Sequence, residues 1–110
     1  GTQQKPYLHV SELLEAMTFI VAQAVERRNV YNIGPKGDGT YVSFLAEKTV
    51  ARVVPGAEIA YAGGDRGWVG DVPRFSYGIA KLAALGWVPR LSSDAAALRA
   101  IDEIATELGL

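Results

Sequence analysis

Segments with the apolar spacing of helices alternate along this chain with short apolar runs typical of buried strands. Apolar side chains recur three and four positions apart at residues 13–25 and again at residues 46–54, which predicts helices with one apolar face. Residues 30–34 and 57–62 form short apolar runs of the kind seen in strands. This alternation favours an α/β layer architecture.

The same pattern predicts where the elements lie. Four strands are expected, at residues 7–10, 30–34 and 57–62 and, briefly, at 40–42. About four helices should alternate with these short strands, and each has a sequence signal at one end. These signals are Ser11 before a helix that runs to about Arg28, Ser43 before one that stops at Pro55, Gly86 as a left-handed cap after residues 76–85, and Ser92 or Ser93 before a last helix from Asp94.

Length and composition exclude several classes of function. A chain of 110 residues is expected to be one domain, residues 1–110. The net charge of −1 argues against general electrostatic binding of nucleic acid. The absence of cysteine and the single histidine, His9, argue against disulfides, a thiolate nucleophile and a Cys- or His-rich metal site. We expect neither a signal peptide nor a membrane span, and hence a cytoplasmic protein.

The glycine-rich segment YAGGDRGWVGDVPR, residues 61–74, is the strongest candidate for a binding site. Its glycines permit close approach of the backbone to a ligand, and Arg66 and Arg74 could donate paired hydrogen bonds to a phosphate. Trp68 could stack on a base or sugar, or simply cover the core. The alternative is an ordered loop in which Arg66 pairs with Asp65 or Asp71. Neither a P-loop nor a dinucleotide-binding fingerprint is present.

Other chemically active side chains have simpler interpretations. We expect His9 to be a hydrogen-bonded structural histidine on a strand rather than a catalytic base. Glu12 and Glu15 should lie on the solvated face of a helix. Lys5 precedes the first predicted strand and by itself indicates little.

Three segments together resemble the C-terminal part of one family. They are QKPYLHVSELLEAM at residues 4–17, VYNIGPKGDGTYVSFLAEKTV at 30–50 and GGDRGWVGDVPRFSYGIAKLAALGWVP at 63–89. Their order and spacing are similar to those of the extended short-chain dehydrogenases/reductases, specifically the NAD-dependent nucleotide-sugar epimerases and dehydratases of the UDP-glucose 4-epimerase type. The resemblance covers nearly the whole chain and does not specify one substrate.

The resemblance implies that two domains have separate roles, one in cofactor binding and catalysis and the other in substrate binding. In that family an N-terminal Rossmann domain binds NAD and carries a catalytic Tyr-x-x-x-Lys, and a small C-terminal domain holds the nucleotide diphosphate of the sugar substrate. This chain resembles the C-terminal domain alone, without the Rossmann half. Tyr77 and Lys81 form a Tyr-x-x-x-Lys but follow the substrate loop, so we do not assign them as the catalytic pair.

The resemblance also assigns substrate-binding residues, namely Lys5, Arg66, Trp68 and Asp71. Lys5 stands where the family often has an arginine that reaches the diphosphate; lysine keeps the charge but lacks the forked geometry. Arg66 is the candidate for a second phosphate-binding arginine, although Trp68 occupies the usual position, and Asp71 would brace the loop or an arginine. No catalytic, metal-binding or cofactor-binding residue is assigned in this chain.

Several expectations follow from this interpretation. NAD would be bound by the N-terminal domain of a parent isomerase or related enzyme, and this chain alone should be inactive. Its partners would be a nucleotide-diphosphate sugar, the Rossmann domain and, in isolation, further copies of itself. One alternative is a free-standing, non-catalytic module that binds a nucleotide or mediates assembly. Another is a reductase of the same superfamily that acts on a different substrate.

Overall fold

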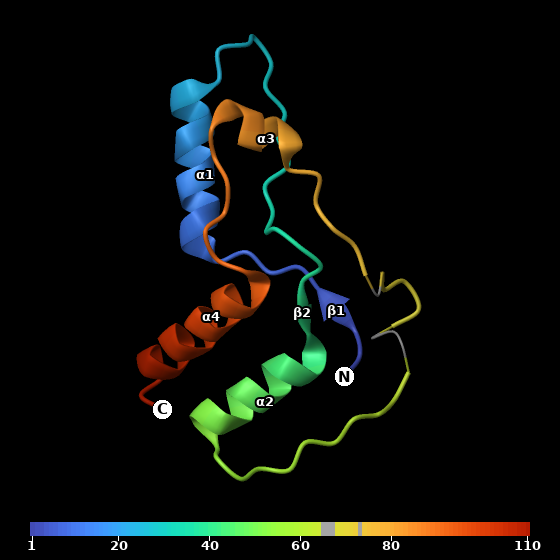
Figure 1. The fold of residues 1–110 in the computed structure, drawn as a ribbon. Helices are drawn as coiled ribbons and strands as arrows, with labels where there is room; N and C mark the ends of the chain where they lie inside the picture. The colour runs from blue at the N-terminus through green and yellow to red at the C-terminus, as the bar shows by residue number, and fades with distance from the viewer. Residues whose placement is uncertain (65–67, 73) are drawn as a thin grey trace.

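The computed structural model describes residues 1–64, 68–72 and 74–110. Within them the protein is a small α/β fold with four helices and one two-stranded antiparallel sheet (Figure 1). In chain order the elements are β1 (Gln4–Lys5), α1 (Val10–Gln23), β2 (Thr40–Tyr41), α2 (Val42–Val53), α3 (Ala80–Leu85) and α4 (Ser93–Glu107).

The four predicted helices are present, with shifted ends. His9, not Ser11, caps α1: its Nδ1 accepts a hydrogen bond from the Ser11 amide, 3.3 Å away. Helix α1 ends at Gln23 rather than near Arg28. Helix α2 begins at Val42, directly after β2, without a side-chain cap.

The two C-terminal helices have the predicted kinds of cap. Helix α3 is shorter than expected, because it begins at Ala80 instead of residue 76. It ends as predicted at Gly86, whose φ of 117° lies in the left-handed region. Ser92 caps α4, since its side chain accepts a hydrogen bond from the Ala95 amide at 3.2 Å.

Most of the predicted strands are wrong. Residues 7–9, 30–34 and 57–62 carry no strand ladder, and Val10 already belongs to α1. The sheet pairs Gln4 with Tyr41 and the neighbouring Lys5 with Thr40, so only the brief strand at 40–42 is confirmed in part. An apolar run predicts a buried extended backbone, but a strand also needs a partner for its amide and carbonyl groups. Within the described residues no second strand pairs with these runs.

The sheet is attached to α4 by side-chain hydrogen bonds. Thr40 is fully buried, and its hydroxyl donates to Asp94 Oδ1 at 2.6 Å. Ser93 Oγ accepts from the Tyr7 amide at 3.1 Å and also contacts the Tyr7 carbonyl oxygen at 3.2 Å. These contacts fix the β1–β2 pair, and with it Lys5, against the start of α4.

The core is small and the molecule is elongated. Ala16, Leu82 and Trp87 form its buried centre, where α1 packs against α3. Helices α2 and α4 pack together at the other end of the molecule (Figure 1). The radius of gyration is 16.5 Å, compared with about 13 Å for a typical folded domain of this length. A molecule of this shape buries fewer side chains than a rounded one.

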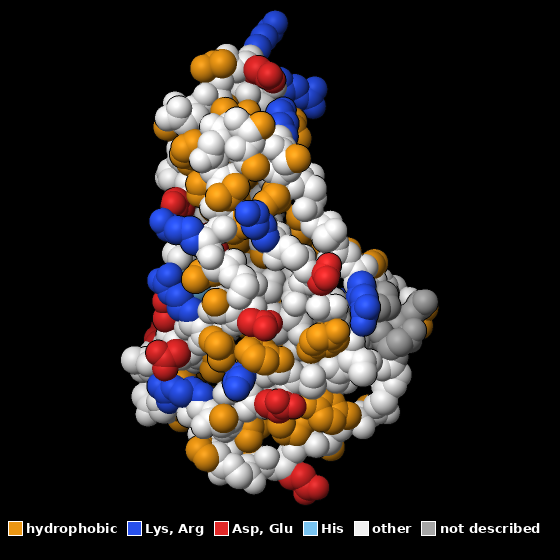
Figure 2. Space-filling model, viewed as in Figure 1, with side chains coloured by type: hydrophobic (Ala, Val, Ile, Leu, Met, Phe, Trp, Pro, Cys, Tyr) orange, Lys and Arg blue, Asp and Glu red, His pale blue; other side chains and the backbone are white. Residues whose placement is uncertain are grey.

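Helix α1 exposes an apolar face on the side away from α3. Val10, Leu14, Met17 and Val21 lie on this face and are 60%, 57%, 50% and 85% exposed. Figure 2 shows hydrophobic side chains at the surface of the end of the molecule formed by α1 and α3. A helix that is apolar on both faces is usually buried on both. None of the helices described is long and apolar enough to cross a membrane.

Candidate functional site

Lys5 and Asp71, two of the predicted substrate-binding residues, meet in the structure. Lys5 Nζ contacts Asp71 Oδ1 and also donates a hydrogen bond to the carbonyl oxygen of Val72. The side chains of Lys5 and Asp71 are 22% and 15% exposed. A lysine in β1 is therefore joined to the glycine-rich segment 66 positions further along the chain.

The backbone around Lys5 is positioned by Gly39. This glycine has a φ of 94° and faces the Lys5 carbonyl group so closely that a Cβ atom there would overlap it and lie 2.7 Å from the Pro6 nitrogen. The Gln4 side chain also donates a hydrogen bond to the Gly39 carbonyl oxygen at 3.2 Å. Only glycine allows this close approach with a left-handed backbone.

Trp68 lies at the surface beside this contact. Its side chain is 70% exposed, so it does not cover the core. The ring lies against Gly70, where a Cβ atom would overlap it. The Asp71 amide donates to the Trp68 carbonyl oxygen at 3.0 Å, which closes a turn just before the carboxylate that contacts Lys5. The exposed indole ring can stack on a planar group. Arg66, the remaining predicted residue, lies outside the described residues.

Two cavities adjoin the glycine-rich segment. One, of about 700 Å³, is lined by Gly1, Thr2, Tyr41, Ser43, Tyr61, Gly63 and Gly64. The other, of about 300 Å³, is lined by Gln4, Asp38, Arg74, Phe75 and Ser76. Open space therefore lies beside residues that are close in sequence to Lys5 and Asp71, such as Gln4 and Arg74.

The described residues do not fit NAD. In the dinucleotide-binding motif a glycine-rich turn follows a strand and opens directly into a helix, whose N-terminus faces the pyrophosphate. Here residues 57–62 form no strand, and α3 begins only at Ala80, well after the glycine-rich segment. Among the described residues, no cluster of three His, Asp or Glu side chains could hold a metal ion either.

His9 has a structural role, though at a helix start and not on a strand. Its side chain is buried, and Nε2 lies 3.0 Å from Glu103 Oε2. The Glu103 pKa is lowered, mainly because Arg99 donates a hydrogen bond to the carboxylate, with a further contribution from His9. The His9–Glu103 pair connects the start of α1 to α4, whereas the Arg99–Glu103 pair lies within α4 itself.

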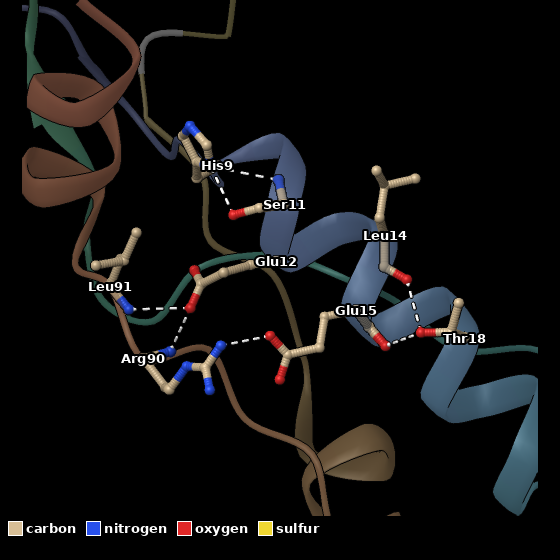
Figure 3. Close-up of polar contacts among 8 residues, drawn as sticks. All are labelled: His9, Ser11, Glu12, Leu14, Glu15, Thr18, Arg90 and Leu91. Carbon is tan, nitrogen blue, oxygen red and sulfur yellow. Dashed lines mark hydrogen bonds and ion pairs between the residues drawn. The ribbon is translucent and has the colours of Figure 1, made fainter. Parts of the chain in front are cut away.

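Glu12 is the clearest residue that sequence reasoning missed. It was expected on the solvated face of α1 but is only 3% exposed. Its Oε1 accepts hydrogen bonds from the amides of Arg90, at 2.7 Å, and Leu91, at 3.2 Å (Figure 3). Glu15, three positions further along the helix, is exposed as expected and forms an ion pair with the Arg90 guanidinium. A helical glutamate gives no sequence signal that backbone amides from residues 90–91 will approach it.

Tyr77 and Lys81 point to different partners. Lys81 Nζ lies 4.6 Å from the centre of the Tyr31 ring, a cation–π distance. The Tyr77 ring packs against Gly34, where a Cβ atom would overlap it.

Comparisons with protein-family models and with curated proteins found no match to this chain.

Proposed function

We propose that this chain is the substrate-binding portion of an NAD-dependent nucleotide-sugar epimerase or dehydratase, in which Lys5 and the glycine-rich segment hold the nucleotide diphosphate. The finer fold assignment, the small C-terminal domain of an extended short-chain dehydrogenase/reductase, belongs to the same proposal. It is supported by the residues quoted for the resemblance and by the arrangement of the side chains that the resemblance selects.

The contact between Lys5 and Asp71 carries the proposal. The resemblance selects these two residues from positions 66 apart in the sequence, and the fold brings them within hydrogen-bonding distance. The residues between them show no sequence pattern that predicts this contact. Trp68 lies on the same turn as Asp71, so three of the four predicted residues gather at one place.

The chemistry of the contact suits a diphosphate. An ammonium group has three N–H donors, and Lys5 directs donors to Asp71 and to the Val72 carbonyl oxygen. These acceptors hold the ammonium group at the edge of the glycine-rich segment, and a remaining donor can reach a phosphate oxygen. Asp71 positions Lys5, and the glycines allow the phosphates to approach the backbone.

In the parent enzyme the diphosphate of the substrate would be remote from the reacting carbon of the sugar. When bound in the N-terminal domain, NAD supplies the hydride chemistry. The residues of this chain bind the diphosphate and orient the sugar, so that binding energy from the non-reacting part of the substrate contributes to catalysis. We place such an enzyme in the cytoplasm, and we expect no turnover from this chain alone.

Calorimetric titration of the chain with UDP tests the proposed site. Lys5→Met removes the charge and should weaken UDP binding about tenfold, the value of one charge-assisted hydrogen bond. Lys48→Met is the matched control, because Lys48 is an exposed lysine on α2 whose ammonium lies over Phe44. Equal affinity in the wild type and the Lys5 variant, or no UDP binding at all, would contradict the proposal.

The coding sequence upstream of the Gly1 codon tests the enzyme assignment separately. A strand followed by Gly-x-x-Gly-x-x-Gly, and a later Tyr-x-x-x-Lys, would support a parent NAD enzyme. A start codon directly before Gly1 would contradict it. The exposed apolar face of α1 would then favour the second candidate, a free-standing nucleotide-binding or assembly module.

A further inference from the structure

Three side chains, two at the start of α1 and one on α4, form a hydrogen-bonded chain outside the proposed diphosphate site. The Ser11 hydroxyl oxygen lies 2.8 Å from His9 Nδ1, and His9 Nε2 lies 3.0 Å from Glu103 Oε2. Figure 3 shows the amide and the hydroxyl of Ser11 directed at the same edge of the His9 ring. A hydroxyl beside a base that is itself oriented by a third group is the arrangement that activates a nucleophile.

The backbone determines which ring nitrogen of His9 carries the proton. The Ser11 amide donates a hydrogen bond to Nδ1 at 3.3 Å, so Nδ1 is an acceptor and the proton of the neutral ring lies on Nε2. Nε2 therefore donates to the Glu103 carboxylate, and the Ser11 hydroxyl donates to Nδ1. The hydroxyl proton thus points at the nitrogen that would remove it, as general-base catalysis requires.

Glu103 can stabilise the ring when it takes up that proton. Arg99 Nε donates to the other carboxylate oxygen of Glu103 at 2.7 Å. This hydrogen bond, with a further contribution from His9, lowers the Glu103 pKa, so the carboxylate stays ionised opposite Nε2. The His9 side chain is only 3% exposed. A positive charge on the ring is therefore stabilised by Glu103 more than by water.

A cavity beside these side chains restricts the class of substrate. It has a volume of about 350 Å³, within the range of small-molecule sites. Its lining consists of the His9 ring, two carboxylates and mostly apolar side chains, among them Leu8, Val10, Ala97 and Ile104. An uncharged, apolar acyl group suits this lining, whereas the carboxylates of Glu103 and Glu107 disfavour an anionic substrate. Ser11 is partly exposed and directly follows Val10, so the nucleophile lies next to the cavity.

We propose that Ser11 is a nucleophile that takes up the acyl group of a neutral, apolar carboxylic ester, with His9 as its general base and Glu103 as a positioning residue. Ser11 Oγ attacks the carbonyl carbon of the ester while the hydroxyl proton passes to Nδ1. The alcohol leaves with that proton, and an acyl-serine remains. Water then attacks the acyl-serine with the help of the same base and releases the acid. This activity uses none of the residues of the proposed diphosphate site.

The first turn of α1 limits the rate of this chemistry. The amides of Glu12 and Leu13 donate to the His9 carbonyl oxygen at 3.0 and 3.1 Å. These two amides are therefore engaged within the turn and do not stabilise the oxyanion of an attacked ester. Removal of one such donor typically slows acyl transfer about 100-fold or more. We therefore expect selective modification of Ser11 by reactive probes and only slow turnover of esters.

Labelling of the chain with an uncharged alkyl fluorophosphonate tests the proposal. Ser11 Oγ bonds to phosphorus, fluoride leaves, and the hydroxyl proton passes to Nδ1. Mass spectrometry should locate the label at Ser11. The folded chain should react about 100-fold faster than the same chain unfolded in urea, the lower end of the range for general-base catalysis. Ser11→Ala should abolish labelling. Thr18→Ala is the control, because it removes an α1 hydroxyl that donates to backbone carbonyl oxygens.

Variants of the other two residues separate activation from folding. His9→Asn keeps a good helix-capping residue but removes the base, so labelling should slow about 100-fold while circular dichroism shows that the helices are retained. Glu103→Gln should slow labelling about tenfold, the value of one charge-assisted hydrogen bond. Glu103→Asp keeps the charge and should recover part of the lost rate.

Several results would overturn the inference. They are no label on the folded chain, a label at another residue, and equal labelling rates in the folded and the urea-unfolded chain. Equal rates in the wild type and a folded His9→Asn variant would overturn it as well. If His9→Asn does not fold, the comparison of the folded and unfolded wild type decides. None of these results affects the diphosphate site, whose test is the dependence of UDP binding on Lys5.

Discussion

At Lys5 an ammonium group from a two-residue strand is held by two oxygen acceptors of the glycine-rich segment. The sequence alone indicated little for this lysine; its resemblance to a family position placed it in a site with Asp71. The direct contact between the two could not be predicted, because it depends on the path of the chain over the 66 positions that separate them. For Asp71, the expected partner was an arginine or the loop itself.

Gly39 provides a residue-scale test of how Lys5 is positioned. Gly39→Ala should destabilise the fold by about 1–3 kcal/mol more than Gly56→Ala does. Both glycines have positive φ, 94° and 90°, but only at Gly39 would the new Cβ overlap the backbone of β1. Chemical denaturation of the two variants measures the difference. Equal losses of stability would show that the close approach to Lys5 contributes nothing.

At the scale of elements, helices were predictable and strands were not. The apolar spacing of α1, α2 and α4 is a local property, and caps such as Ser92 and Gly86 act on their own helix. A strand is defined by its partner. The polar residues Gln4 and Lys5 form β1 because residues 40–41 pair with them. The more apolar runs have no paired strand among the described residues.

The stability of the fold should depend on pH through Glu103, which pairs with Arg99 within α4 and with His9 at the start of α1. Its pKa is lowered in the folded protein, chiefly by the hydrogen bond from Arg99 and also by His9. A carboxyl group with a depressed folded pKa adds stability above its unfolded pKa, and this contribution is lost as pH falls through the folded value. Glu103→Gln should therefore be less stable than the wild type at pH 7, and the difference should shrink in acid.

Urea denaturation of the wild type and Glu103→Gln, at pH 7 and again well below pH 4, measures this change. Glu107→Gln is a control on the same helix, since Glu107 is an exposed α4 carboxyl with no ion pair among the described residues. A stability difference that does not change between the two pH values would show that the Glu103 charge does not stabilise the fold.

At the scale of the whole molecule, the exposed face of α1 predicts self-association of the isolated chain. Val10, Leu14, Met17 and Val21 form an apolar surface that a second copy could cover. Val21→Lys should shift the population towards monomer in sedimentation equilibrium. Leu108→Lys, which charges an exposed apolar side chain at the far end of α4, should not. A wild-type chain that stays monomeric at high concentration would contradict this prediction.

The same elongated shape explains why the site was only partly predictable. With a radius of gyration of 16.5 Å, much of the apolar surface faces outward, and the polar contacts that hold the molecule together come from distant segments. Glu12 is the plainest example: it appeared to be a solvated helical glutamate and instead binds two backbone amides. Such contacts follow from the arrangement of the elements and not from local residue patterns.

The most direct test of the account is an amide NMR titration of the chain with inorganic pyrophosphate. If Lys5 and the glycine-rich segment form a diphosphate site, saturable shifts should appear first at the amides of Lys5, Asp71 and Val72. The amides of α2, Val42–Val53, should not move. Shifts confined to other parts of the chain, or none at millimolar pyrophosphate, would contradict the central claim that this contact binds a nucleotide diphosphate.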